Sequence, residues 1–129
     1  MSSALKLIIF DWDGTLFDSV GQIVASLQFA AEQFNQPLSS EDAKSIIGLG
    51  LPELAHTLFP QVPELHADIL QCYSEHYVAH SKGDAWFAGI SDMLHHLKAQ
   101  GVQLAVATGK SRKGLDRVLA QTQSQDLFV

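Results

Sequence analysis

The sequence predicts an α/β fold in which an all-helical segment interrupts a parallel sheet. Two short, nearly continuous apolar runs, Leu5 to Phe10 and Val102 to Ala107, are typical of parallel strands that are buried on both faces. The long segment between them places its apolar residues at helical spacing instead. A chain of 129 residues favours one domain, or one small domain with an insertion. We therefore expect an α/β core from residues 1–15 and 83–129, with residues 16–82 as a helical insertion.

Four helices are expected within residues 16–82, starting near residues 20, 40, 52 and 63. The first has an apolar stripe from Val20 to Phe34, in which residues recur at intervals of three and four. Ser19 begins a capping-box pattern at its start, and Asp18 is a second candidate cap. Pro52 suits the start of the third helix, because proline lacks an amide hydrogen that the first turn would leave unpaired.

The residues after the insertion complete the expected α/β pattern. Residues 90–100 and 112–123 each place apolar side chains on one side of a predicted helix, and these helices flank the second predicted strand. Gly101 ends the first of them, as glycine commonly does after a helix. Residues 126–129 fit the beginning of a further strand.

Composition and charge exclude several functional classes. The net charge of −6 argues against general nucleic-acid binding, which usually needs a basic surface. A single cysteine, Cys72, excludes an internal disulfide framework and fits a reducing compartment. No apolar run approaches the length of a membrane-spanning helix, and the N-terminal residues do not form a secretory signal. We therefore expect a cytoplasmic protein that binds neither nucleic acid nor membrane.

Two aspartates, one residue apart, follow the first predicted strand, at the end where ligands bind in open α/β sheets. If the backbone stays extended, the carboxylates of Asp11 and Asp13 point to one side and Trp12 to the other. Two carboxylates that share a pocket repel each other unless a cation neutralises them or one takes up a proton. A hard cation such as Mg²⁺ prefers oxygen ligands, and a carboxylate can also serve as a nucleophile or a proton shuttle. Gly14 would let the backbone turn and bring amide groups close to an anion.

The stretch IIFDWDGTLFDS, residues 8–19, resembles the first motif of the haloacid dehalogenase superfamily in its phosphatase form, within the phosphoglycolate phosphatase-like branch. Residues 87–90, Phe-Ala-Gly-Ile, resemble the segment that re-enters the core. Residues 107–110, Ala-Thr-Gly-Lys, resemble the second motif at the end of the next core strand. The resemblance covers essentially the whole chain. It implies a Rossmann-like parallel-sheet core with an inserted all-helical cap, here residues 16–82.

The resemblance also implies a role for each matching residue. Asp11 would attack phosphorus and form an aspartyl-phosphate, while Asp13 would protonate the leaving oxygen and then activate water. Mg²⁺ would be held by the Asp11 carboxylate and the Asp13 backbone carbonyl. The substrate phosphate would be bound by residues around both strand ends, namely Gly14, Thr15, Thr108, Gly109 and Lys110. Asp13 favours phosphate chemistry over carbon–halogen cleavage, because the dehalogenases of the superfamily have no general acid at that place.

The expected function is Mg²⁺-dependent hydrolysis of a small phosphorylated metabolite, a phosphomonoester such as 2-phosphoglycolate. A sugar phosphomutase of the same superfamily would use the same two aspartates, so the first motif leaves that alternative open. A signalling receiver also accepts phosphate on an aspartate. Receivers carry that aspartate on a later strand, however, and a helical insertion directly after the first strand does not fit them.

Part of the superfamily's catalytic set has no match in this chain. A later lysine and a Gly-Asp pair followed by another aspartate are absent, and Lys110 is an imperfect substitute for that lysine. The chain is therefore expected to hold the first half of the core, to show little phosphatase activity by itself and to bind Mg²⁺ weakly. A non-catalytic fragment is a third alternative, and the open edge of a two-stranded sheet would permit self-association.

Overall fold

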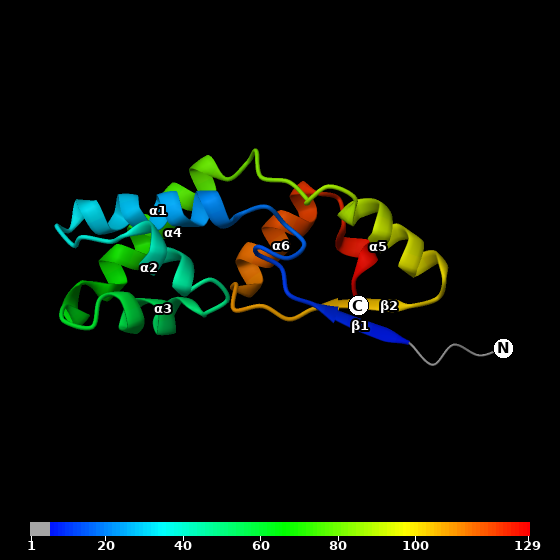
Figure 1. The fold of residues 1–129 in the computed structure, drawn as a ribbon, viewed down its shortest axis with the longest axis horizontal. Helices are drawn as coiled ribbons and strands as arrows, with labels where there is room; N and C mark the ends of the chain where they lie inside the picture. Colours follow the sequence, from blue (N-terminus) through cyan, green and yellow to red (C-terminus); the bar gives the residue numbers. More distant parts are fainter. Residues whose placement is uncertain (1–5) are drawn as a thin grey trace.

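The computed structural model describes residues 6–129, so Leu5 of the first predicted strand lies outside the described residues. Strand β1 (Leu7–Phe10) and strand β2 (Gln103–Val106) pair in parallel, in the register that sets Phe10 opposite Val106. Figure 1 shows the two strands side by side toward one end of the molecule. The predicted α/β class with a parallel sheet is therefore confirmed.

Four of the five α-helices that lie between the two strands in the described chain form a body of their own beside the sheet (Figure 1). They are α1 (Val20–Gln33), α2 (Ser40–Ser45), α3 (Leu51–Leu58) and α4 (His66–His80), with a 3₁₀ turn at Pro63–Leu65 before α4. The apolar stripe of α1 is buried against α4: Leu27 shares one apolar cluster with Tyr77, and Ala30 shares another with Ile69. The predicted helices are present, while the domain boundaries at residues 16 and 82 stay a prediction. No helix among residues 6–129 is long and apolar enough to cross a bilayer.

The strand-bearing part has a separate apolar core. Helices α5 (Ile90–Ala99) and α6 (Arg112–Gln121) contribute Leu94 and Leu115 to it, and β2 contributes Leu104. The predicted helices at residues 90–100 and 112–123 are thus present with slightly shorter ends. Their apolar sides are buried because they face the sheet.

Trp12 lies at the centre of this core and is completely buried. Its ring centroid is 5.3 Å from that of Phe17, 5.2 Å from that of Trp86 and 6.0 Å from that of Phe128. Aromatic rings at such separations attract each other in addition to the surface that they bury. The residue between the two aspartates therefore anchors the end of β1 to the core.

One face of the sheet is uncovered, which corrects the expectation that the strands are buried on both faces. Helices α5 and α6 lie on the same side of the sheet (Figure 1). Leu7 and Ile9 are 44% and 61% exposed, whereas Ile8 and Phe10 are half-buried. Alternate side chains of a strand point to opposite faces, so covering one face leaves every second side chain exposed.

Residues 126–129, expected to begin a strand, follow that expectation only in part. Gln125–Leu127 form a 3₁₀ turn, and Phe128 then adopts an extended conformation. The Val129 amide donates to the Leu104 carbonyl of β2 at 2.8 Å. Strand-like pairing is therefore limited to the last residues of the chain.

Candidate active site

The carboxyl ends of β1 and β2 lie next to each other. The Ala107 amide after β2 donates to the Phe10 carbonyl at 2.8 Å, which extends the strand pairing to the ends of both strands. Asp11 directly follows Phe10, and Thr108 directly follows Ala107. The two predicted motifs therefore meet at the edge of the sheet where open α/β folds bind ligands.

A tight turn follows β1, and Trp12 is buried although it lies between the two aspartates in sequence. The Trp12 carbonyl accepts hydrogen bonds from three following amides, at 3.0 to 3.2 Å. Gly14 has a φ of +79°, a left-handed conformation that glycine adopts without strain, and its amide donates to the Phe17 carbonyl at 2.9 Å. Trp12 is buried in the core, whereas Asp11 is exposed and Asp13 is half-buried. This arrangement agrees with the expectation that Trp12 points away from the aspartates.

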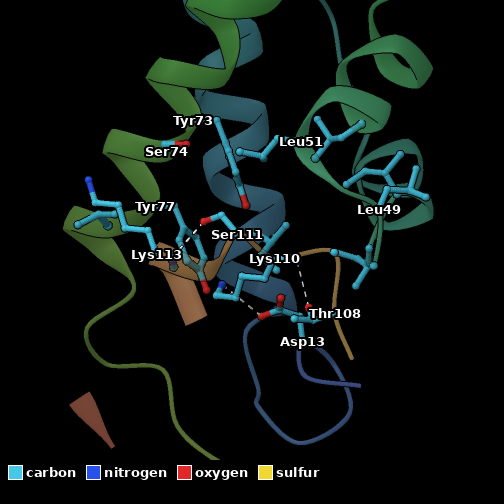
Figure 2. Close-up of a pocket in the computed structure, with 18 of the residues that line it drawn as sticks. Asp13, Leu49, Leu51, Tyr73, Ser74, Tyr77, Thr108, Lys110, Ser111 and Lys113 are labelled. Carbon is cyan, nitrogen blue, oxygen red and sulfur yellow. Dashed lines mark hydrogen bonds and ion pairs between the residues drawn. The ribbon is translucent and has the colours of Figure 1, made fainter. Parts of the chain in front are cut away.

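The Asp13 carboxylate is held by two groups from other segments. The Ser19 hydroxyl donates to Asp13 Oδ1 at 2.7 Å, and Lys110 Nζ lies 3.8 Å from the same oxygen. Figure 2 shows the ion pair between Asp13 and Lys110. The two side chains are only 14% and 12% exposed, so little water screens the pair. Ser19 and Lys110 therefore fix the position of this carboxylate.

Ser19 occupies the N-cap position of α1 without forming the expected capping box. Its side chain makes no capping hydrogen bond to the first turn, because its hydroxyl is turned toward Asp13. Its backbone (φ −113°, ψ −7°) also lacks the extended conformation that N-cap residues usually adopt. Asp18, the other candidate cap, lies one residue before the N-cap position and is exposed. Neither Ser19 nor Asp18 caps α1 through its side chain, so both capping predictions are wrong.

Asp11 is the more accessible of the two aspartates, and its Oδ2 accepts a hydrogen bond from the Thr15 hydroxyl at 3.1 Å. No lysine or arginine among residues 6–129 forms an ion pair with Asp11. Carboxylate oxygens are ligands that Mg²⁺ prefers, so the donors fit this ion in chemical type. Within the same described part of the chain, no three His, Cys, Asp or Glu residues form a group that could hold a metal. The two aspartates therefore supply only part of a magnesium site.

Lys110 is held between the first motif and helix α4. Its burial lowers the pKa of Lys110 below the usual value for lysine, while the nearby Asp13 carboxylate acts in the opposite direction. Its Nζ lies 4.9 Å from the ring centroid of Tyr77, within the range of cation–π attraction. The Lys110 amide also donates to the Thr108 hydroxyl at 3.1 Å, so the second motif forms a compact turn.

A cavity of about 630 Å³ lies between helices α2–α4 and the end of β2. The predicted site residues that line it are Asp13, Thr108, Gly109 and Lys110. Asp11, Gly14 and Thr15 are not among the lining residues and belong to the turn beside the cavity. The structure therefore brings the second aspartate and the second motif to one cavity, with the remaining predicted residues on its border.

Gly109 lies directly against the loop between α2 and α3. A β-carbon built on Gly109 would lie 2.5 Å from the Gly48 carbonyl oxygen and 2.8 Å from the Gly50 amide nitrogen. Such separations are too short for any side chain, so only glycine fits between the two segments. The glycine-rich loop of the helical part is thus closed over the second motif.

Comparison with known proteins identifies the family. The family model for haloacid dehalogenase-like hydrolases matches residues 8–129. The chain belongs to this family. The match covers both motifs and every helix between them, and phosphoglycolate phosphatases among the relatives confirm the branch that the first motif predicts.

Two relatives and one solved structure show how far the similarity reaches. The tyrosine-protein kinase PtkA of Mycobacterium tuberculosis is 35% identical over an alignment of 117 residues, and the alignment covers 88% of this chain and 39% of that protein. The phosphoglycolate phosphatase of Aliivibrio fischeri is 29% identical over an alignment of 143 positions that includes gaps, covering 99% of this chain and 61% of the relative. The crystal structure of a predicted phosphatase from Clostridium acetobutylicum has a TM-score of 0.84 at 24% identity, covering 98% of this chain and 59% of the other. This haloacid dehalogenase-like hydrolase chain therefore spans less than two thirds of the length of these three proteins.

Two residues of this haloacid dehalogenase-like hydrolase contact the site although sequence reasoning did not place them there. Ser19 bonds Asp13, and Tyr77 of α4 lies against Lys110. Ser19 is the last residue of the stretch that resembles the first motif, so its closeness in sequence to the aspartates could have indicated this contact. Tyr77 is distant in sequence from both motifs, and only the packing of α4 beside the second motif brings it to Lys110.

Replacing Gly109 with alanine is expected to displace the loop at Gly48–Gly50 from the second motif. The new β-carbon would overlap backbone atoms, which a side-chain rotation cannot relieve. We expect a loss of about 1–3 kcal/mol in the free energy of unfolding. We also expect a fall of about 10- to 100-fold in kcat/KM, because small displacements misplace groups around a reacting centre. Urea unfolding and steady-state hydrolysis of the full natural protein measure the two effects.

Gly83 provides a matched control for that substitution. A β-carbon on Gly83 would meet no atom within 4 Å, and its backbone has no left-handed conformation. Gly83→Ala should therefore leave both unfolding and hydrolysis close to those of the unsubstituted protein. If Gly109→Ala behaved like Gly83→Ala, the close contact between loop and motif would be contradicted.

Proposed function

We propose that this protein is a Mg²⁺-dependent phosphomonoester hydrolase that works through an aspartyl-phosphate on Asp11. The observation that carries the proposal is an exposed Asp11 beside an Asp13 that Ser19 and Lys110 hold at the edge of a cavity. Membership of the haloacid dehalogenase-like hydrolases supports this chemistry. The phosphoglycolate phosphatases among the relatives are the reason to include 2-phosphoglycolate in the panel of esters that tests the proposal.

In the first half-reaction, an oxygen of the Asp11 carboxylate forms a bond to phosphorus, and the bond between phosphorus and the ester oxygen breaks. Asp13 gives a proton to the departing oxygen, so the alcohol leaves as a neutral molecule. Lys110 is close enough to Asp13 to serve both the carboxylate and an incoming phosphate. A phosphate dianion would therefore compete with Asp13 for the Lys110 ammonium group.

In the second half-reaction, Asp13 removes a proton from a water molecule that attacks phosphorus. The bond between Asp11 and phosphorus then breaks, which releases inorganic phosphate and restores both carboxyl groups. The Ser19 hydroxyl keeps Asp13 oriented through both half-reactions. Water is the only further reactant, so the hydrolysis needs neither an oxidant nor a second substrate.

Mg²⁺, when bound, would neutralise the negative charge of the carboxylates and of the phosphoryl oxygens. The groups that would hold it are the Asp11 carboxylate and the Asp13 backbone carbonyl. Asp11 fits this role, because its carboxylate is exposed and pairs with no lysine or arginine among the described residues. Lys110, whose ammonium group lies close to Asp13, would bind the phosphate.

Phosphate release from a panel of small phosphomonoesters tests the proposal on the full natural protein. We expect turnover with Mg²⁺ and a loss of at least about 100-fold after removal of divalent ions with a chelator. Readdition of Mg²⁺ should restore the rate, whereas readdition of Na⁺ at equal ionic strength should not. Metal-independent turnover, or no phosphate release from any ester, would contradict the proposal.

The same assay separates the alternative functions. A sugar phosphomutase would interconvert sugar phosphate isomers with little release of inorganic phosphate. A receiver-like protein would accumulate a long-lived acyl-phosphate without turnover. A non-catalytic chain would do neither, and it would bind phosphate esters without changing them.

The proposed function also implies a binding partner and a location in the cell. We propose a small phosphorylated metabolite as the binding partner, a cytoplasmic location, and no interaction with nucleic acid or membrane. The exposed Leu7 and Ile9 and the open edge of β1 support self-association through the sheet. Light scattering at increasing protein concentration would measure that association.

A further inference from the structure

The cavity has a polar end and an apolar end. The core contributes charged and hydroxyl-bearing side chains to it, including Asp13, Thr108, Lys110, Ser111, Lys113 and Arg117. The segments around α2 and α3 contribute apolar side chains, including Ile46, Ile47, Leu49, Leu51 and Leu54. Figure 2 shows Asp13 and Thr108 at one end and Tyr73 and Leu51 at the other.

The helical side of the cavity carries no charge. Among the described lining residues from α1 to α4, none is Asp, Glu, Lys, Arg or His. Gln71 and Ser74 are the polar members of that set besides two tyrosines. The lysines and the arginine that line the cavity all follow β2, and Lys110 and Arg117 lie 4.9 and 5.8 Å from the Tyr77 ring centroid, away from the leucines of α3 and of the loop before it.

Tyr73 and Tyr77, one turn apart on α4, form an aromatic wall of this cavity. Their ring centroids are 5.9 Å apart and the ring planes differ by 28°. A tyrosine hydroxyl is neutral at physiological pH, and burial, with the nearby Asp13 carboxylate as a smaller cause, raises the pKa of both tyrosines further. Neutral aromatic faces pack well against apolar or aromatic groups of a ligand.

These walls discriminate between the organic parts of phosphate esters. A carboxylate placed against Leu49, Leu51 and Leu54 would lose its hydration without a cation of that wall to pair with, which is unfavourable. An uncharged apolar group would instead bury surface against the leucines and tyrosines, as ligands commonly do in such cavities. A two-carbon acid would also leave much of the 630 Å³ unfilled if its phosphate lay at Lys110.

We propose that the preferred substrate is a phosphomonoester of an uncharged, apolar alcohol or phenol, with its organic group against the helical wall. The inference rests on the proposed phosphatase function and deepens it. The phosphate would lie at the border of the cavity, within reach of Asp11 and Lys110, and 2-phosphoglycolate would be a poorer substrate. Leu49 is a specificity-determining residue, because it lines the cavity and is 43% exposed on the loop that touches Gly109.

Hydrolysis of matched esters by the full natural protein tests the inference. We expect kcat/KM for phenyl phosphate and n-butyl phosphate to exceed that for 2-phosphoglycolate and O-phosphoserine by at least about 10-fold. A preference for the charged esters, or equal efficiency for all four, would overturn the inference while leaving the phosphatase function intact. Absence of hydrolysis for every ester would contradict the phosphatase function instead.

A charge placed in the wall should reverse the preference. Leu49→Lys introduces a cation on an exposed loop position, so we expect it to lower kcat/KM for phenyl phosphate and to raise it for 2-phosphoglycolate. Leu49→Met keeps the wall apolar and should preserve the original order. Phe29→Lys changes a similarly exposed residue of α1 that does not line the cavity, and it should also preserve the order. If Leu49→Lys kept the same ratio of kcat/KM between phenyl phosphate and 2-phosphoglycolate as the unsubstituted protein, the inference would be overturned.

Binding of inert analogues gives a readout that does not depend on turnover. In phenylphosphonate and phosphonoacetate, phosphorus is bonded directly to carbon, and a phosphomonoester hydrolase does not cleave that bond. Calorimetry should show at least about 10-fold tighter binding of phenylphosphonate, with the difference reversed in Leu49→Lys. Tighter binding of phosphonoacetate, or no binding of either compound, would overturn the inference.

Discussion

Replacing Asp11 with asparagine is expected to lower the rate of phosphomonoester hydrolysis by at least about ten-thousand-fold. The substitution keeps the size of the side chain and removes the charged oxygen that forms the bond to phosphorus. It also removes the exposed carboxylate that would hold Mg²⁺. Because Asp11 is exposed and is bonded only through the Thr15 hydroxyl among the described side chains, the fold should be preserved. Steady-state phosphate release measures the rate, and thermal unfolding checks the fold.

Asp18 provides the matched control for Asp11. It is an exposed aspartate of the same segment, and it follows the turn rather than the strand. Asp18→Asn removes one negative charge and should change the rate by less than about threefold, since surface substitutions usually have small effects. If both variants lost activity equally, general charge in this segment would account for the effect, and the nucleophilic role of Asp11 would be contradicted.

Replacing Trp12 with alanine is expected to lower the free energy of unfolding by about 3–5 kcal/mol. Trp12 is completely buried and its ring packs against Phe17, Trp86 and Phe128, so the substitution leaves a large cavity in the core. A loss of this size is a large fraction of the stability of an ordinary domain. Urea unfolding followed by circular dichroism measures it.

Two further variants separate packing from other effects at Trp12. Trp12→Phe keeps most of the ring and removes an indole N–H that is buried without a hydrogen-bond partner in the described part of the chain. We expect it to cost only about 1–2 kcal/mol. Phe87→Ala removes an aromatic ring that is 36% exposed, and it should cost less than Trp12→Ala. A Trp12→Ala variant as stable as Phe87→Ala would contradict the central packing role of Trp12.

The sequence predicted the features that depend on local pattern. The apolar runs before Asp11 and before Thr108 became paired parallel strands, because buried strands need apolar residues and their ends need polar ones. The helical stripe after Ser19 became α1, because its spacing places one apolar side against α4. Sequence similarity to a known motif supplied the proposed roles of the two aspartates, which no pattern of spacing could have specified.

The features that sequence reasoning missed depend on contacts between distant segments. The expectation of two buried sheet faces was wrong, because an apolar run does not show how many helices cover it and Ile9 is exposed. Tyr77 meets Lys110 only through the packing of α4 beside the second motif. The capping prediction for Ser19 was wrong because its hydroxyl is turned toward the Asp13 carboxylate and its backbone is not extended. Such a side-chain orientation is visible only once the chain is folded.

The central claim is that Asp11 carries the phosphoryl group during hydrolysis. The most direct measurement is mass spectrometry of the full natural protein, quenched in acid during turnover of a phosphomonoester and digested into peptides. We expect one phosphoryl group on the peptide that contains Asp11, and we expect it to disappear in Asp11→Asn. Turnover without any phosphorylated peptide, or a phosphoryl group on Asp13 or another residue, would contradict the claim.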